Sequence, residues 1–224
     1  MQSNILRNAA MAVMFTTVSA VSAFAADLSP FTRVEATYTD SGYDNFRRSA
    51  NNLSAREGYY AIGTQLTIGA VLGSSHEISF TTGYTKWEGD QYGPVGVASI
   101  SHDIEQVPLL LNYRYHYKLF EKLTLVFGPS AGLVHETATD NVLRNDWPVV
   151  GLKPVGTYSD SAWKTAFGGG LGISYAVAQG WEINAAAQIL RLDSKNYDLA
   201  GTTLRAPYDS VTRIGFSLGV GYHW

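Results

Sequence analysis

The chain has 224 residues, a formal net charge of -3 at pH 7 and no cysteine. Hydrophobic residues make up 46% and aromatic residues 12%. Charged residues make up only 16%, against a usual share of about 25%. This composition excludes a disordered chain, a disulfide scaffold and a thiolate metal site, and the charge balance argues against a nucleic acid partner.

Residues 1–25 predict an export signal. Arg7 supplies a positive charge, an apolar stretch follows from 9 to 21, and Ala23 and Ala25 form a small-x-small cleavage site. The apolar stretch is shorter than the roughly 20 residues of a spanning helix, and no later segment approaches about 18 consecutive apolar residues. We therefore predict a cleaved signal at 1–25 and one domain from 26 to 224. An exported chain without cysteine fits a bacterial envelope protein.

After the signal, apolar and polar residues alternate with period two, which is typical of β-strands whose two faces meet different surroundings. The alternating segments are 31–39, 58–71, 76–87, 105–117, 123–136, 163–177, 181–192 and 210–224. Their number is even, as an antiparallel barrel with both ends on one side requires. Many exceed the roughly 9–11 tilted residues that cross a bilayer core. The pattern predicts an all-β fold, an eight-stranded antiparallel up-and-down transmembrane β-barrel.

The connections between these segments alternate in length. Short turns are expected at 72–75, 118–122 and 178–180, whereas long polar loops are expected at 40–57, 88–103, 137–162 and 193–209. Strict alternation places all long loops at one end of the barrel. Outer-membrane barrels have this arrangement, with short periplasmic turns and long outer loops.

The choice between a membrane barrel and a soluble one depends on which face is apolar. The opposite face carries small and polar residues, which suit a narrow lumen better than a surface in water. Aromatic residues lie near both ends of the apolar face, where Tyr and Trp prefer the bilayer interface. Those near the short turns are Tyr115, Tyr117, Tyr175, Trp181, Tyr222 and Trp224, and those near the long loops are Tyr38, Tyr60 and Tyr84.

The last segment carries a recognisable pattern. Apolar residues occupy every second position before a terminal aromatic residue: Phe216, Leu218, Val220, Tyr222 and Trp224. This resembles the C-terminal signature of bacterial outer-membrane barrels, in which Phe is the usual last residue. Segments 107–115 and 167–175 also resemble those of OmpA-like and opacity-type small outer-membrane proteins. The resemblance covers the chain after residue 25 and implies that these five residues are read by the barrel-assembly machinery.

Several charges fall on the inward face. Those expected near the short turns are Arg33, Glu35, Glu77, Arg114, His116 and Glu182, and Arg213 is expected near the long loops. Glu77 and Arg114 lie on neighbouring segments and are expected to pair. The lumen of an eight-stranded barrel is just filled by side chains, so these charges predict a structural plug. A gated, narrow ion path is the alternative.

Catalytic and metal sites are not indicated. His135-Glu136 and Ser101-His102-Asp103 lie near the predicted outer rim, but neighbouring side chains on a strand point to opposite faces. We interpret them as polar loop residues. No pair of histidines has metal-ligand spacing, and we predict no cofactor and no catalysis.

The predicted function is an integral protein of the bacterial cell outer membrane with a structural or surface-interaction role, such as a loop-presenting adhesin. A lipid A-modifying enzyme and a narrow ion channel are the alternatives. Expected partners are outer-membrane lipid and lipopolysaccharide, the barrel-assembly machinery, and a host or cell-surface ligand of the four loops. Arg47 and Arg48 are candidates for lipopolysaccharide phosphates.

Overall fold

The structure is a computed structural model of the whole chain. It describes residues 28–40, 54–55, 60–92, 99–145, 152–193, 195–196, 207–208 and 211–224. The expected export signal, as well as Arg47 and Arg48, lies outside these residues. No helix among the described residues is long and apolar enough to cross a bilayer.

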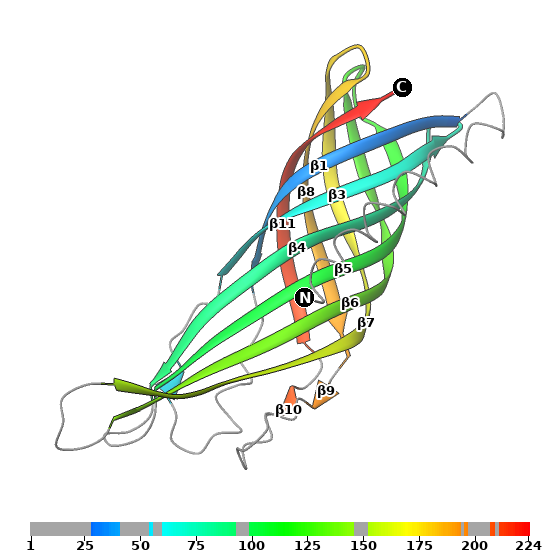
Figure 1. Cartoon of the computed structure of the whole chain (residues 1–224). Coiled ribbons are helices and arrows are strands. Elements are labelled where there is room, and N and C mark those ends of the chain that lie inside the picture. The colour runs from blue at the N-terminus through cyan, green and yellow to red at the C-terminus, as the bar shows by residue number, and fades with distance from the viewer. Residues whose placement is uncertain are drawn as a thin grey trace.

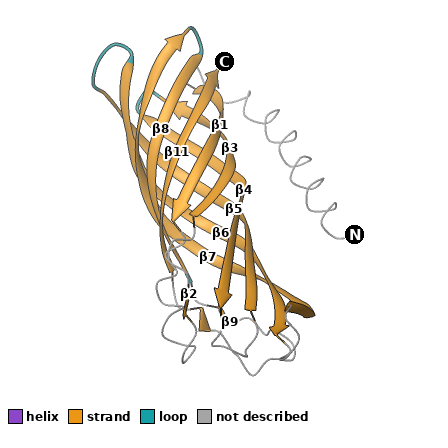
Figure 2. Cartoon of the chain, turned by 90° about the vertical axis from the view of Figure 1, so that its left-hand side faces the viewer, coloured by secondary structure: helices purple, strands orange, loops and turns teal. Residues whose placement is uncertain are grey.

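Eight long antiparallel strands close into a barrel (Figures 1 and 2). They are β1 (Leu28–Asp40), β3 (Tyr60–Leu72), β4 (His76–Tyr92), β5 (Ser99–Lys118), β6 (Leu123–Asn145), β7 (Leu152–Ala178), β8 (Trp181–Leu192) and β11 (Val211–His223). Each long strand pairs with the next one along the chain, and β1 pairs with β11 to complete the ring. The predicted eight-stranded barrel is therefore confirmed.

Three strands of two residues each accompany the barrel. β2 (Ser54–Ala55) pairs with the end of β4, and β9 (Lys195–Asn196) pairs with β10 (Pro207–Tyr208). All three lie within the predicted loops 40–57 and 193–209. The remainder of these two loops, apart from Asp40 and Asp193, lies outside the described residues.

The barrel is apolar outside and polar inside, as the alternation predicted. Ile62, Leu111 and Leu218 are each more than 60% exposed on the outer surface. Arg33 and Glu77, by contrast, are buried in the interior. A water-soluble barrel has the opposite arrangement, so this surface is suited to contact with lipid.

Short turns lie at one end of the barrel, together with the C-terminus (Figure 2). They occupy 73–75, 119–122 and 179–180, within the predicted ranges. Gly73 (φ 56°) and Gly180 (φ 75°) supply the left-handed backbone that these tight reversals require. We call this end the short-turn end and the opposite end the long-loop end.

Two of the predicted long loops are mostly strand. β4, β5, β6 and β7 have 17, 20, 23 and 27 residues, whereas β1, β3, β8 and β11 have only 12 or 13. The prediction of loops over 88–103 and 137–162 is therefore wrong for most of their length. Outward positions there, such as Thr137, Thr139 and Ser161, are polar because they lie beyond the apolar belt. Strands in this region therefore cannot be recognised by apolar residues at outward positions, although Thr itself favours β-strands.

These extensions form a sheet that continues beyond the ends of the four shorter strands (Figure 1, lower left). Its backbone consists of 87–92, 99–104, 137–145 and 152–161, and we call it the projecting sheet. Ala138 and Ile104 are buried on its inner face. Ser159 and Ser161 are exposed on its outer face.

Glycine permits the close approach of β7 to β8. A Cβ atom built on Gly168 would overlap the carbonyl oxygen of Ile189 on β8. We expect Gly168→Val to lower the unfolding free energy by about 1–3 kcal/mol, as overpacking does in other interiors. The matched control is Ala187→Val, on the outer face of β8. Urea unfolding in detergent checks this prediction, and equal midpoints for the two variants would contradict it.

Candidate functional site

A cluster of charges fills the lumen at the short-turn end. Arg33 of β1 lies at its centre: Nη2 is 2.9 Å from Glu182 Oε1 and 3.5 Å from Glu77 Oε2. Nε of Arg33 also donates to Glu182 Oε1 at 3.1 Å. A single guanidinium thus bridges carboxylates from β8 and β4, which suits the fork of arginine better than the point charge of lysine.

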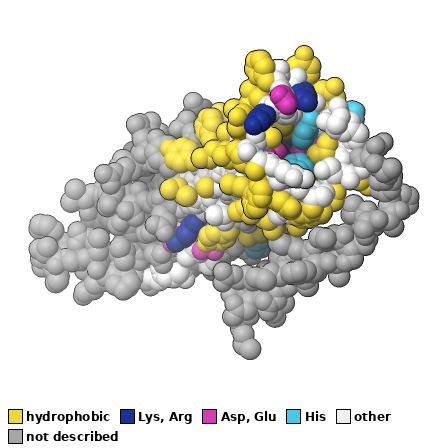
Figure 3. Space-filling model, turned by 90° about the horizontal axis from the view of Figure 1, so that it is seen from above, with side chains coloured by type: hydrophobic (Ala, Val, Ile, Leu, Met, Phe, Trp, Pro, Cys, Tyr) yellow, Lys and Arg dark blue, Asp and Glu magenta, His cyan; other side chains and the backbone are white. Residues whose placement is uncertain are grey.

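Two histidines extend this cluster. His116 Nε2 lies 2.9 Å from Glu77 Oε2, and His223 Nε2 lies 3.3 Å from Glu182 Oε2. We call Arg33, Glu77, His116, Glu182 and His223 the short-turn cluster. It joins β1, β4, β5, β8 and β11 across the lumen. Figure 3 views this end, where apolar side chains surround a mouth lined by histidine and charged groups.

His223 is not among the inward charges expected from the sequence. Its position in phase with Gly219 and Gly221 is the signal that assigns it to the inward face.

Arg114 and Glu35 lie nearby but have other partners. Glu77 and Arg114 face each other in register, yet the expected ion pair between them is not among the contacts of the described residues. Arg114 Nη2 instead donates to Ser130 Oγ at 3.3 Å. Glu35 Oε1 accepts a hydrogen bond of 3.0 Å from Ser217. Arg33 and His116 make the direct contacts with the Glu77 carboxylate, and Arg114 acts on Glu77 as a nearby charge.

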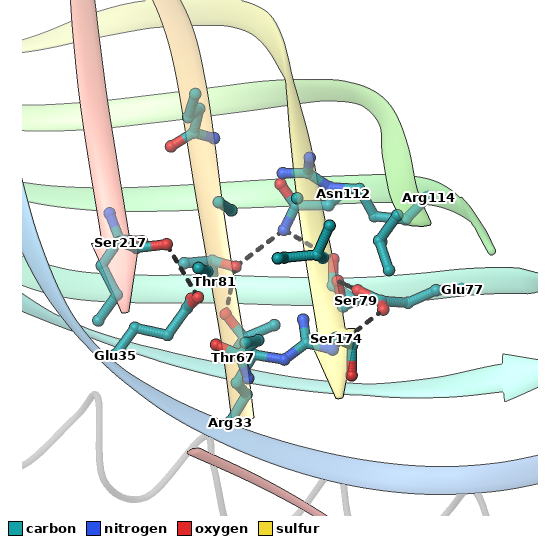
Figure 4. Close-up of a pocket in the computed structure, with 18 of the residues that line it drawn as sticks. Arg33, Glu35, Thr67, Glu77, Ser79, Thr81, Asn112, Arg114, Ser174 and Ser217 are labelled. Atoms are coloured by element: carbon teal, nitrogen blue, oxygen red, sulfur yellow. Dashed lines mark hydrogen bonds and ion pairs between the residues drawn. The ribbon is translucent and has the colours of Figure 1, made fainter. Parts of the chain in front are cut away.

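A polar cavity adjoins this cluster (Figure 4). The space open to the centres of water molecules is about 60 Å³, room for roughly four to six waters. Thr67 and Thr81 share a hydroxyl hydrogen bond of 2.8 Å on its wall, and Asn112 Nδ2 donates to Thr81 Oγ1 at 2.8 Å. Asn112 Oδ1 is buried without a hydrogen-bond partner among the described residues, so water in the cavity would satisfy it.

An apolar cluster lies next along the lumen, on the neighbouring strands β5, β6, β7 and β8. Leu110, Val134, Ala166 and Leu192 pack together, and each is at most 3% exposed. Along the inward face of β6, Val134 lies between Ser130, near the cavity, and Glu136, which belongs to a second charged layer. We call these four residues the apolar plug.

The second charged layer lies on the long-loop side of the apolar plug. Glu136 is completely buried, with Oε1 2.7 Å from Lys164 Nζ and Oε2 3.2 Å from Arg213 Nη2. Gln106 also donates to Glu136 Oε2. The guanidinium carbon of Arg213 lies 4.3 Å from the ring centre of Trp87. We call Gln106, Glu136, Lys164 and Arg213 the outer cluster.

The structure places Arg213 inward near the long-loop end, as expected, but it corrects the assignment of Glu136 to a polar outer loop. Lys164 is not among the inward charges expected from the sequence. Both residues continue an inward phase already visible in the sequence, Glu136 after Val134 and Lys164 before Ala166. This alternation is the sequence feature that identifies Glu136 and Lys164 as inward-facing residues.

The histidine motifs near the outer rim lie on strands. His135 points outward, and its ring lies edge-on to Trp163 with 4.8 Å between ring centres. Asp103 Oδ2 is 3.5 Å from Lys86 Nζ, and the side chains of Ser101 and His102 are outside the description. No described contact joins His135 to a hydroxyl group. Among the residues that the structure describes, no group of His, Asp or Glu could hold a metal ion.

The C-terminal signature forms a stripe on the outer surface. Its members are all exposed: Phe216, Leu218, Val220, Tyr222 and Trp224. The ring of Tyr222 lies 5.0 Å from that of Trp181 and 5.8 Å from that of Trp224. The stripe follows β11, the strand that completes the barrel by pairing with β1.

Residues 11–223 match the outer membrane protein beta-barrel domain family. Comparison with curated proteins gives no match. Among solved structures, a major outer membrane protein from Thermus thermophilus is 12% identical with a TM-score of 0.51, over 87% of this chain and 99% of that chain. Neisserial surface protein A is 12% identical with a TM-score of 0.49, over 87% and 97% of the two chains. Pseudomonas aeruginosa OprG is 13% identical with a TM-score of 0.49, over 88% and 97%.

At 12% identity the Thermus thermophilus structure shows the fold alone, and the family match covers nearly the whole chain. The expected resemblance to small outer-membrane barrels is thereby confirmed. The chain belongs to the outer membrane protein β-barrel family and is a protein of the bacterial outer membrane.

Proposed function

We propose that this protein is a closed, non-catalytic scaffold that presents its projecting sheet and outer loops for surface interaction. The observation that carries the proposal is a contrast between the two parts of the molecule. The lumen is filled by stacked layers of charged and apolar side chains, whereas four neighbouring strands extend well beyond the barrel.

The stacked layers argue against the channel alternative. An ion would have to pass the apolar plug and part Glu136 from Arg213, whose contact joins β6 to β11 across the lumen. Separating buried ion pairs costs several kcal/mol, because each charge loses its partner in a medium that hydrates it poorly. A gated path would need a rearrangement of both layers together.

The presenting role is supported by the length of β4 to β7. In barrels of this family, short turns face the periplasm and long connections face outward. The projecting sheet therefore extends from the cell surface, with exposed hydroxyl groups such as Ser159 and Ser161. The ligand of the outer loops would be a molecule on a host or another cell.

Replacement of the connections between β4 and β5 and between β6 and β7 tests this role. In one variant, 93–98 and 146–151 are each exchanged for a two-residue turn; in the control, only the short turn 119–122 is exchanged. We expect the first variant to lose most binding of expressing cells to host cells, while the control keeps it. Heat-modifiable mobility on SDS gels shows that both are folded. Unchanged binding by the first variant would contradict the role.

The enzyme alternative has its own test. Mass spectrometry of lipid A from cells with and without the protein should give identical profiles, because His135 contacts Trp163 rather than a nucleophile. A modified lipid A that disappears in His135→Ala would overturn the non-catalytic assignment.

The proposed partners in the membrane follow from the outer stripe. We assign Phe216 and Trp224 to recognition by the barrel-assembly machinery, since they lie exposed on the closing strand. The lipid-facing surface would contact outer-membrane lipid and lipopolysaccharide.

A further inference from the structure

The outer surface of the barrel changes character within one row of side chains on β5, β6 and β7. Val107, His135 and Trp163 are aligned in register across these strands. On the short-turn side of the row, Leu133 of β6 is exposed and apolar, whereas β7 has the exposed Thr165 before the apolar Phe167. On the other side, the next outward residues of β6 and β7 are Thr137 and Ser161. The row therefore marks the level at which acyl chains give way to headgroups.

Beyond this row, β6 and β7 present hydroxyl groups side by side. Thr137 is aligned with Ser161, and Thr139 with Ser159. Thr139 Oγ1 donates to Ser159 Oγ at 3.2 Å, and Ser159 and Ser161 are exposed. Trp163 is 43% exposed, and its indole is supported by the edge-on ring of His135. A flat aromatic surface thus borders a ladder of hydroxyl groups.

Charges flank the ladder on both sides, and on the β8 side Arg191 lies next to Phe167 while Asp193 accepts a hydrogen bond from Thr165. Lys86, Asp103 and Glu105 are on the outer face of β4 and β5, and Lys86 Nζ is 3.5 Å from Asp103 Oδ2. The ladder itself carries no lysine or arginine, the residues that hold phosphate. Its chemistry favours uncharged groups that both donate and accept hydrogen bonds.

We propose that His135, Thr137, Ser159, Ser161 and Trp163 form a lateral site for the sugar rings of an outer-leaflet glycolipid, and we call them the boundary patch. The apolar face of a sugar ring packs on the indole of Trp163. Sugar hydroxyl groups exchange hydrogen bonds with Thr137 and Ser161. The inference rests on the outer-membrane location and is independent of the proposed scaffold role.

The boundary patch adjoins the lipid-facing surface, and this continuity favours a glycolipid as its ligand. Acyl chains that contact Leu133 and Phe167 hold their headgroup at the level of Trp163, because chain and headgroup are one molecule. The site is therefore supplied with sugar at high local concentration, and weak individual contacts add up. A soluble glycan lacks this second attachment.

The experiment measures binding of purified rough-type lipopolysaccharide to the folded protein in detergent, scored as glycolipid retained per protein by mass spectrometry. We expect Trp163→Leu to weaken binding about tenfold, and Thr137→Val with Ser161→Ala to weaken it several-fold, since each lost hydrogen bond counts for a factor of about 2–10. The controls are Trp181→Leu, exposed at the short-turn end, and Thr64→Val, exposed on the outer face of β3. Both should bind within twofold of the original protein.

Three ligand arms separate the sources of the binding. Dephosphorylated lipopolysaccharide should bind almost as well as the intact molecule, and the variants should not differ from the original protein in retaining phosphatidylethanolamine. Loss of binding on dephosphorylation would overturn the proposal in favour of phosphate recognition. If the patch variants lost phosphatidylethanolamine binding to the same extent as lipopolysaccharide binding, the patch would be a general lipid-binding surface. Tight binding of the free core oligosaccharide alone would indicate a soluble glycan, and equal binding by all variants would exclude the site.

Discussion

Glu136→Gln should destabilise the barrel by about 3–5 kcal/mol, the usual cost of breaking a buried ion pair by changing one partner. The substitution keeps the shape of the side chain but removes the carboxylate that Lys164 and Arg213 share. Both cations are at most 5% exposed at the side chain and so remain charged in a poorly hydrated interior. Urea unfolding in detergent, followed by tryptophan fluorescence and heat-modifiable mobility, measures the change.

The matched control is Glu105→Gln, one strand away on the outer face, where the side chain is exposed. It should stay within about 0.5 kcal/mol of the original protein. Replacing Glu136, Lys164 and Arg213 together by Leu, Met and Met should recover most of the loss, because the three paired charges are then removed together. A Glu136→Gln barrel as stable as its control would mean that the outer cluster is not what holds this part of the lumen together.

Arg33→Met should produce a loss of similar size, about 3–5 kcal/mol, at the other end of the lumen. Arg33 contacts Glu77 and Glu182, whose side chains are 1% and 9% exposed. Without the guanidinium, the buried carboxylates of Glu77 and Glu182 lose the cation that bridges them. The same urea assay applies.

Arg33→Lys should fall between the original protein and Arg33→Met, because one ammonium does not bridge both carboxylates as the planar fork does. Lys118→Met, at the exposed end of β5, is the control and should leave the midpoint unchanged. If Arg33→Met unfolds at the same urea concentration as Lys118→Met, the short-turn cluster contributes nothing to stability.

The alternation of the sequence predicted the inward or outward direction of nearly every side chain within the apolar belt. This works because a bilayer imposes one rule on all eight strands: apolar residues outward and small or polar residues inward. Arg33 and Val34, which are neighbours in the sequence, accordingly lie on opposite faces. A turn residue such as Gly73 further limits the register by ending each hairpin.

The same rule failed where the strands leave the bilayer. Beyond Trp163 and His135, the outward residues of β6 and β7 face water and include Thr137, Thr139, Ser159 and Ser161, so the alternation no longer contrasts apolar with polar. Strand and loop then look alike in composition, and the projecting sheet was mistaken for two loops. Backbone pairing with neighbouring strands, rather than local pattern, decides the structure there.

The lumen clusters were only partly predictable for a different reason. Period two identifies which charges point inward, but the partner of each depends on strand tilt and side-chain reach across the lumen. Glu77 and Arg114 are adjacent in register, yet Glu77 pairs with Arg33, two strands away across β3. Contacts across the ring are not visible in the order of the sequence.

Conductance in planar lipid bilayers tests the closed lumen most directly. The protein is inserted from a preparation whose folded state is verified by heat-modifiable mobility, and current is recorded in salt at both signs of voltage. The apolar plug and the two charged clusters predict a silent membrane. Reproducible single-channel steps from the unaltered protein would contradict the closed lumen and restore the channel as its function.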